Sequence, residues 1–99
     1  MSKSFLKSQL HYKRAINTIP MGSQTFSKST FAFPYGVSPL FAESANGCKL
    51  IDADGNEFID LVNALLSVLL GHNDKDVYSA VVNQLKKGTN FSLPHALEY

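Results

Sequence analysis

The chain has 99 residues, of which 44% are hydrophobic, 17% charged and 11% aromatic. This composition excludes a disordered tail, a collagen-like repeat and a low-complexity segment. The net charge of +1 is too small for a dedicated nucleic-acid-binding protein. The single cysteine, Cys48, cannot form an internal disulfide, so we expect the chain to be held by burial alone. A lone cysteine in a strand is usually a small buried side chain, and we expect this of Cys48.

The charge is unevenly distributed along the sequence. Residues 1–42 contain five basic residues and no acid, whereas residues 43–99 contain four lysines and eight acids. An acid-free amphipathic N-terminus is similar to an organelle transit peptide, but its single arginine favours a surface helix with a basic outer face. No apolar run approaches the roughly 18 residues that a membrane span requires. We therefore expect a cytoplasmic protein without a membrane segment.

The first third of the chain predicts a helix followed by a long loop. Apolar residues recur at helical spacing over about residues 3–17, and Pro20 and Gly22 end that pattern. Residues 20–35 show neither a helical nor a strand period, which predicts an ordered loop of a length that usually has a function. We expect four aromatic residues to anchor this loop: Phe26, Phe31, Phe33 and Tyr35.

Three short runs predict an antiparallel meander over residues 38–43, 48–52 and 57–61. Asn46-Gly47 is a favoured pair for the first hairpin turn, and Asp54-Gly55-Asn56 marks the second. The apolar contacts of this sheet are expected from Phe41, Leu50, Ile51, Phe58 and Ile59.

The strongest helix signal follows the meander. Asn73 or Asp74 can cap the helix, Gly88 ends it, and acids and lysines occupy the turns that the helix dipole favours. Its apolar stripe is Val77, Ala80, Val81 and Leu85. After a turn at residues 89–94, His95–Tyr99 predicts the first turn of another helix, and a chain that stops there suggests an incomplete protein.

The segment Asp52–Asp60 is similar to a calcium-binding loop, with carboxylates or an amide at the first, third, fifth and ninth positions. Glu57 stands where that loop needs glycine, and Asn63 stands where it needs a bidentate glutamate. We therefore interpret the segment as a hairpin turn. His72 shows no metal-ligand spacing and is expected to form hydrogen bonds at the turn before the last long helix.

Four stretches resemble the N-terminal region of class III pyridoxal-phosphate aminotransferases, nearest to the glutamate-1-semialdehyde aminomutase branch. Ile19–Gly22 is similar to the Pro-Gly-Gly opening of the family, and Gly47–Asp60 matches its block of Asp-x-Asp-Gly-Asn followed by Tyr-Ile-Asp. Leu69–Asn73 matches its Leu-Gly-His, and Phe91, Pro94 and Glu98 match the segment that opens its next helix. The resemblance covers about residues 15–99.

The resemblance implies a fold type I enzyme that uses pyridoxal 5'-phosphate (PLP), is homodimeric when complete, and acts on a small-molecule amino donor and acceptor. The implied fold class is α+β, with a helix and substrate-arm loop at residues 1–35 and the meander and helix of a small domain at residues 36–99. In this family the Schiff-base lysine, the aspartate at the pyridine nitrogen and the phosphate-binding loop all lie further along the chain. Residues 1–99 are therefore expected to hold no catalytic, cofactor-binding or metal-binding residue and to be inactive alone.

The candidate substrate contacts implied by the resemblance are Gln24, Thr25, Lys28 and Leu65. Lys28 stands where the family offers an arginine for the substrate carboxylate, and it is either a contact for the substrate anion or an ordinary solvated lysine. Leu65 replaces an aromatic side chain that lines the substrate pocket in the aminomutase branch. These departures leave open another amino acceptor, such as a sugar or a longer amine. The alternative function is a free-standing, non-catalytic binding module that uses the loop aromatics.

Overall fold

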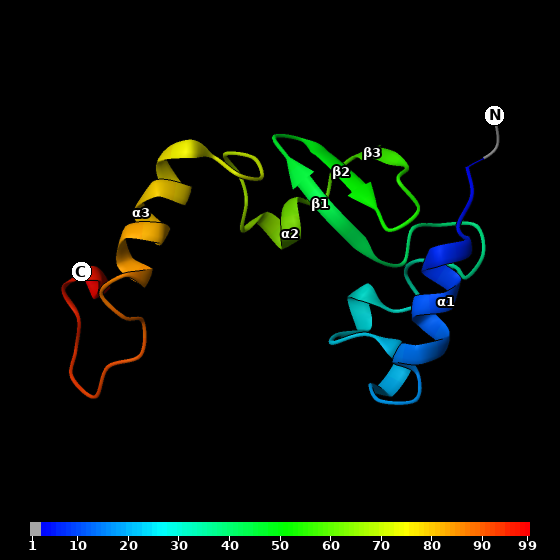
Figure 1. Ribbon diagram of the computed structural model, residues 1–99, viewed down its shortest axis with the longest axis horizontal. Coiled ribbons are helices and arrows are strands. Elements are labelled where there is room, and N and C mark those ends of the chain that lie inside the picture. The colour runs from blue at the N-terminus through cyan, green and yellow to red at the C-terminus, as the bar shows by residue number, and fades with distance from the viewer. Residues whose placement is uncertain (1–2) are drawn as a thin grey trace.

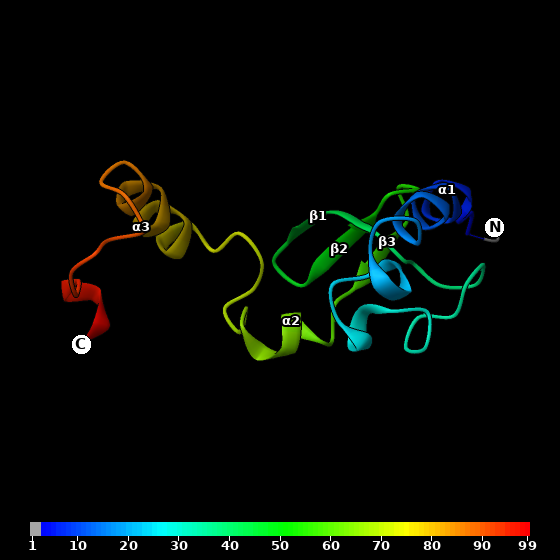
Figure 2. The same cartoon turned by 90° about the horizontal axis from the view of Figure 1, so that it is seen from below.

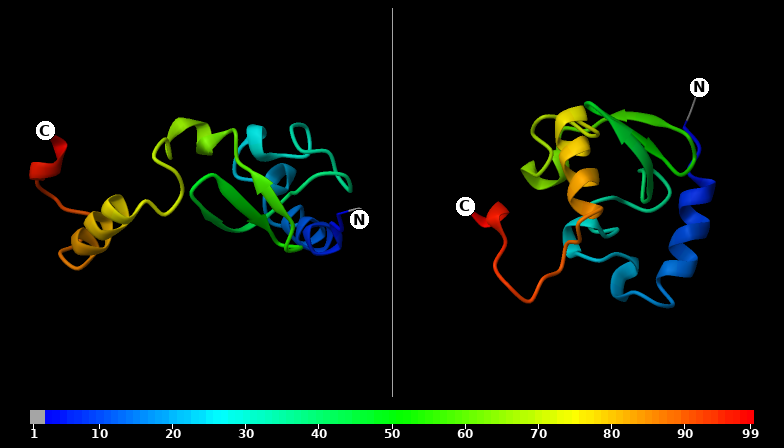
Figure 3. Two further views of the ribbon diagram at one scale, coloured as in Figure 1. Left: turned by 90° about the horizontal axis from the view of Figure 1, so that it is seen from above. Right: turned by 60° about the vertical axis from the view of Figure 1, so that its left-hand side comes forward.

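The computed structural model describes residues 3–99 as an elongated α+β arrangement (Figure 1). The elements in chain order are α1 (Leu6–Ala15), η1 (Pro20–Gly22), η2 (Phe26–Lys28), β1 (Ala42–Asn46), β2 (Lys49–Asp52), β3 (Glu57–Ile59), α2 (Asn63–Leu66), α3 (Lys75–Leu85) and η3 (Ala96–Glu98). The radius of gyration is 16.6 Å, whereas a compact domain of this length has one of about 13 Å. Figures 1, 2 and 3 show α1 beside the sheet and α3 projecting at the opposite end. Among the described residues, no helix is long and apolar enough to cross a membrane.

The sheet is the predicted antiparallel meander, in the order β1-β2-β3. Its first strand covers Ala42–Asn46, so the prediction of residues 38–43 was wrong. Pro39 provides no N–H for a ladder, and the register shifts between Ala42 and Ser44. Because Asn46 pairs with Lys49, the tight turn is formed by Gly47 and Cys48, one residue later than predicted. Cys48 is exposed at this turn rather than buried.

The segment that resembles a calcium-binding loop is the turn between β2 and β3, as predicted. The Asp52 side chain is 1% exposed and accepts hydrogen bonds from within the turn. Its Oδ1 accepts the backbone N–H groups of Asp54, at 3.0 Å, and Asn56, at 2.8 Å, and its Oδ2 accepts the Asn56 side-chain amide at 2.8 Å. The carboxylate of Asp52 thereby stabilises the hairpin.

The same turn docks against the start of α1. The Asp54 carboxylate accepts the backbone N–H groups of Lys7, at 2.8 Å, and Ser8, at 2.9 Å. The Asn56 side-chain amide donates to the Ser4 carbonyl at 2.7 Å. Burial raises the pKa of Asp54, but the hydrogen bonds from the N–H groups of Ser8 and Lys7 together lower it by more. The pKa of Asp54 therefore lies below its usual range. Asp54 thus satisfies helix donors that α1 cannot satisfy from its own residues.

We expect Asp54→Ala to increase amide hydrogen exchange in α1 severalfold, because the variant leaves the first N–H groups of the helix without an acceptor. Since the pKa of Asp54 is lowered in the folded state, its contribution is present above about pH 4 and disappears as the pH falls through the folded-state value. Exchange measured by mass spectrometry across this range checks both effects. Glu43→Ala removes an exposed acid on β1 and serves as the control. Equal exchange in the two variants would contradict the capping role.

Helix α3 begins and ends as the sequence predicts. The Asp74 carboxylate accepts the backbone N–H groups of Asp76 and Val77, both at 3.1 Å. Gly88, with φ of +105°, follows the last turn. The predicted helical turn near residue 96 also forms, and His95 caps it through a hydrogen bond from the Leu97 N–H at 3.1 Å.

Hydrophobic burial in the described residues is small. Ala15 is the one buried hydrophobic side chain there. The expectation that Phe26 and Phe31 anchor the loop of residues 20–35, called the arm loop below, was wrong. These side chains are 61% and 74% exposed, and their rings stack on each other with centroids 5.2 Å apart. Ile59, expected in the sheet contacts, is 57% exposed. The apolar stripe of α3 is also exposed at Val77, Val81 and Leu85. Residues 3–99 thus leave most of their large apolar side chains uncovered.

Candidate functional site

The arm loop brings three of the four predicted contact residues together. The Lys28 side-chain amine donates to Gln24 Oε1 at 3.2 Å, and the Lys28 backbone N–H donates to the Thr25 carbonyl at 3.1 Å. The Thr25 hydroxyl lies 3.1 Å from that of Ser27. All three predicted residues are exposed, so they are available to a ligand.

The arm loop is held against α1 by close packing. Gly22 has φ of +70°, and a Cβ atom there would lie 2.7 Å from the Tyr12 ring. The Tyr12 ring also lies 5.5 Å from that of Tyr35, further along the loop. A side chain at position 22 would therefore be strained by the left-handed backbone and would have to push the Tyr12 ring aside.

Lys28 has no carboxylate partner within the described residues. Among residues 3–99, carboxylates contact basic side chains at Lys49–Glu57 and His72–Asp60, so the charge of Lys28 meets only the neutral amide of Gln24 there. An exposed ammonium without a counter-charge can bind an anion, although it lacks the bidentate geometry of arginine.

Leu65, the fourth predicted contact, lies on the unusual turn α2. Asn63, Ala64, Leu65 and Leu66 have φ values of 50°, 48°, 58° and 71°. Left-handed backbone costs about 1–2 kcal/mol for each non-glycine residue, and a run of this kind persists only where its surroundings hold it. The residues between α2 and Gly71 form turns. Leu65 is 69% exposed at the turn.

Asp60 and His72 lie at the two ends of this segment. Asp60 Oδ2 and His72 Nε2 are 2.7 Å apart, and Asp60 Oδ1 accepts the N–H groups of Val62, at 2.9 Å, and Asn63, at 3.0 Å. The hydrogen bond with His72 lowers the pKa of Asp60 below its usual range against the opposing effect of burial, and the two N–H groups lower it further. The prediction that His72 forms hydrogen bonds at this turn is confirmed, whereas the sequence analysis missed Asp60. The signal that could have found it is an aspartate that directly follows a strand and precedes the histidine of the Gly-His motif by 12 residues.

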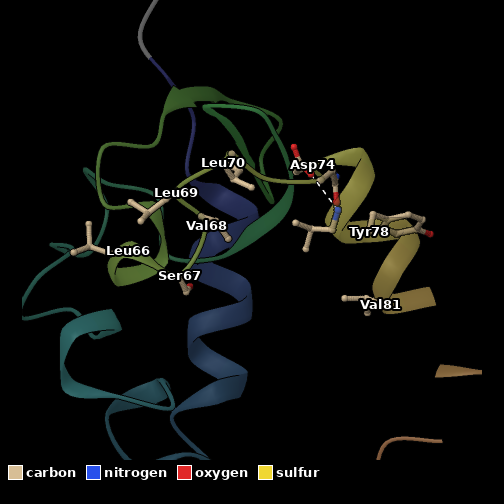
Figure 4. A pocket seen from close by; sticks show the side chains of 11 residues that line it. Leu66, Ser67, Val68, Leu69, Leu70, Asp74, Tyr78 and Val81 are labelled. Carbon is tan, nitrogen blue, oxygen red and sulfur yellow. Dashed lines mark hydrogen bonds between the residues drawn. The ribbon is translucent and has the colours of Figure 1, made fainter. Parts of the chain in front are cut away.

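An apolar groove of about 360 Å³ separates the loop after α2 from α3. Figure 4 shows the leucines of residues 66–70 on one side and Tyr78 and Val81 of α3 on the other. Asp74 lies at its end with its carboxylate bonded to the start of the helix. The groove is predominantly apolar and holds no lysine, so it suits packing against another apolar surface better than chemistry on a substrate.

Metal-binding clusters and buried lysines are both absent from the described residues. Residues 3–99 contain no group of three side chains able to hold a metal ion. All eight lysines are exposed, whereas a lysine that forms a Schiff base needs a pocket that lowers its pKa. The pKa of Lys49 is raised instead of lowered, because the Glu57 carboxylate lies 2.8 Å from its amine and stabilises the charged form through a hydrogen bond and its charge.

The sequence and the fold both match known aminotransferases. The family model of aminotransferase class-III matches residues 30–99. A glutamate-1-semialdehyde 2,1-aminomutase from Desulforapulum autotrophicum is 40% identical over 92 residues, which cover 93% of this chain and 21% of that protein. An omega-transaminase structure from Sphaerobacter thermophilus is 32% identical, with a TM-score of 0.71 over 86% of this chain and 18% of that one.

A solved transaminase with PLP bound is 27% identical, with a TM-score of 0.80 over 94% of this chain and 21% of that one. The chain therefore spans about a fifth of the length of these relatives. The expected α+β fold class, as part of a PLP-dependent transaminase, is confirmed by these neighbours. Since the family model covers well over half of the residues, the chain belongs to the aminotransferase class-III family.

Proposed function

We propose that the complete protein is a PLP-dependent aminotransferase or aminomutase that transfers an amino group between an amino donor and an aldehyde or keto acceptor similar to glutamate-1-semialdehyde. The observation that carries this proposal is the 40% identity to a glutamate-1-semialdehyde 2,1-aminomutase across 93% of the chain. The solved transaminase with PLP bound supports the same cofactor. PLP supplies the electron sink that amino transfer requires.

In this proposal, residues 1–35 form a substrate arm and residues 36–99 form part of a small domain. The lysine and the other groups that hold PLP belong to residues beyond 99. The complete protein is a cytoplasmic homodimer, and the exposed apolar faces of α3 and the arm loop are covered by its large domain or by the partner subunit. The low burial within residues 3–99 supports such a cover over the exposed apolar faces.

Gln24, Thr25, Lys28 and Leu65 then line the entrance to the substrate pocket. The Lys28 ammonium attracts an anionic group of the substrate, and Gln24 holds that ammonium through the hydrogen bond at 3.2 Å. Lysine binds an anion as a point charge, whereas arginine grips a carboxylate with two parallel hydrogen bonds. The acceptor is therefore expected to be bound more loosely at this point than in enzymes that use arginine.

The experiment that tests the function uses the complete protein purified with PLP. We expect an absorbance band of a protein-bound imine that survives gel filtration, and conversion of glutamate-1-semialdehyde or a related amino acceptor in an amino-transfer assay. Absence of the band and of amino transfer to a panel of aldehyde and keto acceptors would overturn the proposal.

Lys28→Ala in the complete enzyme is expected to raise KM for an anionic acceptor by about tenfold or more with little change in kcat, since the side chain acts in binding. Steady-state kinetics measures both constants. Lys13→Ala removes another exposed lysine, on α1, and should leave KM unchanged. A KM for Lys28→Ala equal to that of the Lys13→Ala control would show that Lys28 is only a solvated surface residue.

A further inference from the structure

The segment between Asp60 and His72 is closed at its base. Asp60 and His72 are joined by their side chains at 2.7 Å. The backbone N–H of Asp60 donates to the Cys48 carbonyl at 2.8 Å. The backbone of His72 exchanges two hydrogen bonds with Gly47, at 2.8 and 2.9 Å. Both ends of the segment are therefore fixed to the same tight turn between β1 and β2.

One carboxylate connects this closed base to the left-handed turn. While Asp60 Oδ2 meets His72, Asp60 Oδ1 accepts the N–H groups of Val62 and Asn63, which lead into α2. The side chains of His72 and Asp60 are 20% and 10% exposed, so water competes little for these bonds. Removing the carboxylate would release the base of the segment and the entry of the turn at the same time.

The left-handed turn needs such support because its backbone is intrinsically unfavourable at four successive non-glycine residues. Leu65 is the third of the four, so the direction of its side chain depends on this conformation. We infer that Asp60 and His72 are positioning residues that hold α2 left-handed and thereby fix Leu65 at the substrate entrance. The inference rests on the proposed function for the role of Leu65 in selecting the acceptor.

The kinetic test compares variants of the complete enzyme with a short and a long aldehyde acceptor. Leu65→Ala is expected to shift the ratio of kcat/KM for the two acceptors. Asp60→Asn is expected to lower kcat/KM for the preferred acceptor by about tenfold or more, because small misplacements of groups that orient a substrate are costly. In the Asp60→Asn background, Leu65→Ala should no longer shift the ratio. His72→Ala should resemble Asp60→Asn, and His72→Gln, which keeps a donor, should restore part of the selectivity.

Glu57→Gln is the matched control, since it removes a carboxylate of β3, close to Asp60 along the chain, that pairs with the exposed Lys49. It is expected to leave the acceptor ratio unchanged. If Leu65→Ala shifts the ratio equally with and without Asp60, the positioning role is wrong. A general loss of folding would instead lower activity on both acceptors alike, which would also contradict the inference.

A second measurement reads the turn without relying on activity. Leu65→Cys in a Cys48→Ser background places a reporter thiol on the turn, and its rate of reaction with a thiol reagent, measured against the Cys48→Ser parent, depends on its setting. We expect Asp60→Asn to change this rate severalfold and Glu57→Gln to leave it unchanged. An unchanged rate with Asp60→Asn would overturn the inference even in an active enzyme. A changed rate in a protein without amino transfer would support the clamp on the turn and overturn the proposed function, together with the role of Leu65 in selectivity.

Discussion

Gly71→Ala is expected to lower the free energy of unfolding of the complete protein by about 3 kcal/mol. Gly71 has φ of +97°, a region that side chains with a Cβ rarely adopt. A Cβ atom at this position would lie 3.1 Å from the Cα of Gly47 and 3.3 Å from its carbonyl carbon and oxygen. These are backbone atoms of the bridge between Gly47 and His72, which cannot move aside as a flexible side chain would.

Gly55→Ala provides the control for this change. Gly55 has a similar φ of +85° in the turn between β2 and β3, but beyond its two chain neighbours no heavy atom lies within 4 Å of its added Cβ. Its substitution carries only the conformational cost of about 1 kcal/mol. Urea unfolding followed by circular dichroism compares the two. Equal destabilisation would mean that the close approach of Gly71 to Gly47 contributes nothing.

The isolated chain of 99 residues is expected to catalyse no amino transfer, even with saturating PLP. Amino transfer by PLP requires a lysine that can form and exchange a Schiff base within a pocket. Every lysine here is exposed, and the pKa of Lys49 is raised by Glu57 rather than lowered. The measurement is a coupled assay at high protein concentration, with the complete enzyme as the positive control. Turnover above that of free PLP would contradict the assignment of the catalytic groups to residues beyond 99.

The elements that the sequence predicted are those set by neighbouring residues. Helix α3 depends on Asp74 at one end and Gly88 at the other, and both act within a few residues along the chain. The two hairpins depend on Gly47 and Gly55 in their turns. Such signals are local, so a single sequence contains them.

The features that the sequence analysis missed depend on contacts between distant residues. The carboxylate that caps α1 comes from Asp54, 46 positions beyond Ser8. No local pattern gives the left-handed turn at Leu65, because only Asn63 among its residues tolerates that conformation readily. The contact between Asp60 and His72, which closes the segment around this turn, joins residues 12 positions apart.

Burial was the least predictable property, for a related reason. The helical spacing of Val77 and Val81 correctly indicates an apolar face, but it does not say what covers that face. In the same way, Phe26 and Phe31 were expected to anchor the arm loop and instead stack on each other at the surface. Of the candidate site, the sequence proposed Lys28 and Gln24, and the structure adds the hydrogen bond between them. The role of Leu65 as a substrate contact remains a prediction.

We expect this stretch of chain to depend on packing against other parts of a larger enzyme. Small-angle scattering of the isolated chain, combined with calorimetric melting, can show whether it does. We expect an expanded or self-associating species that melts without a sharp transition, because Ala15 is the one buried hydrophobic residue in the part of the chain that the structure describes. A monomer with a radius of gyration of about 13 Å and a single cooperative transition would contradict it.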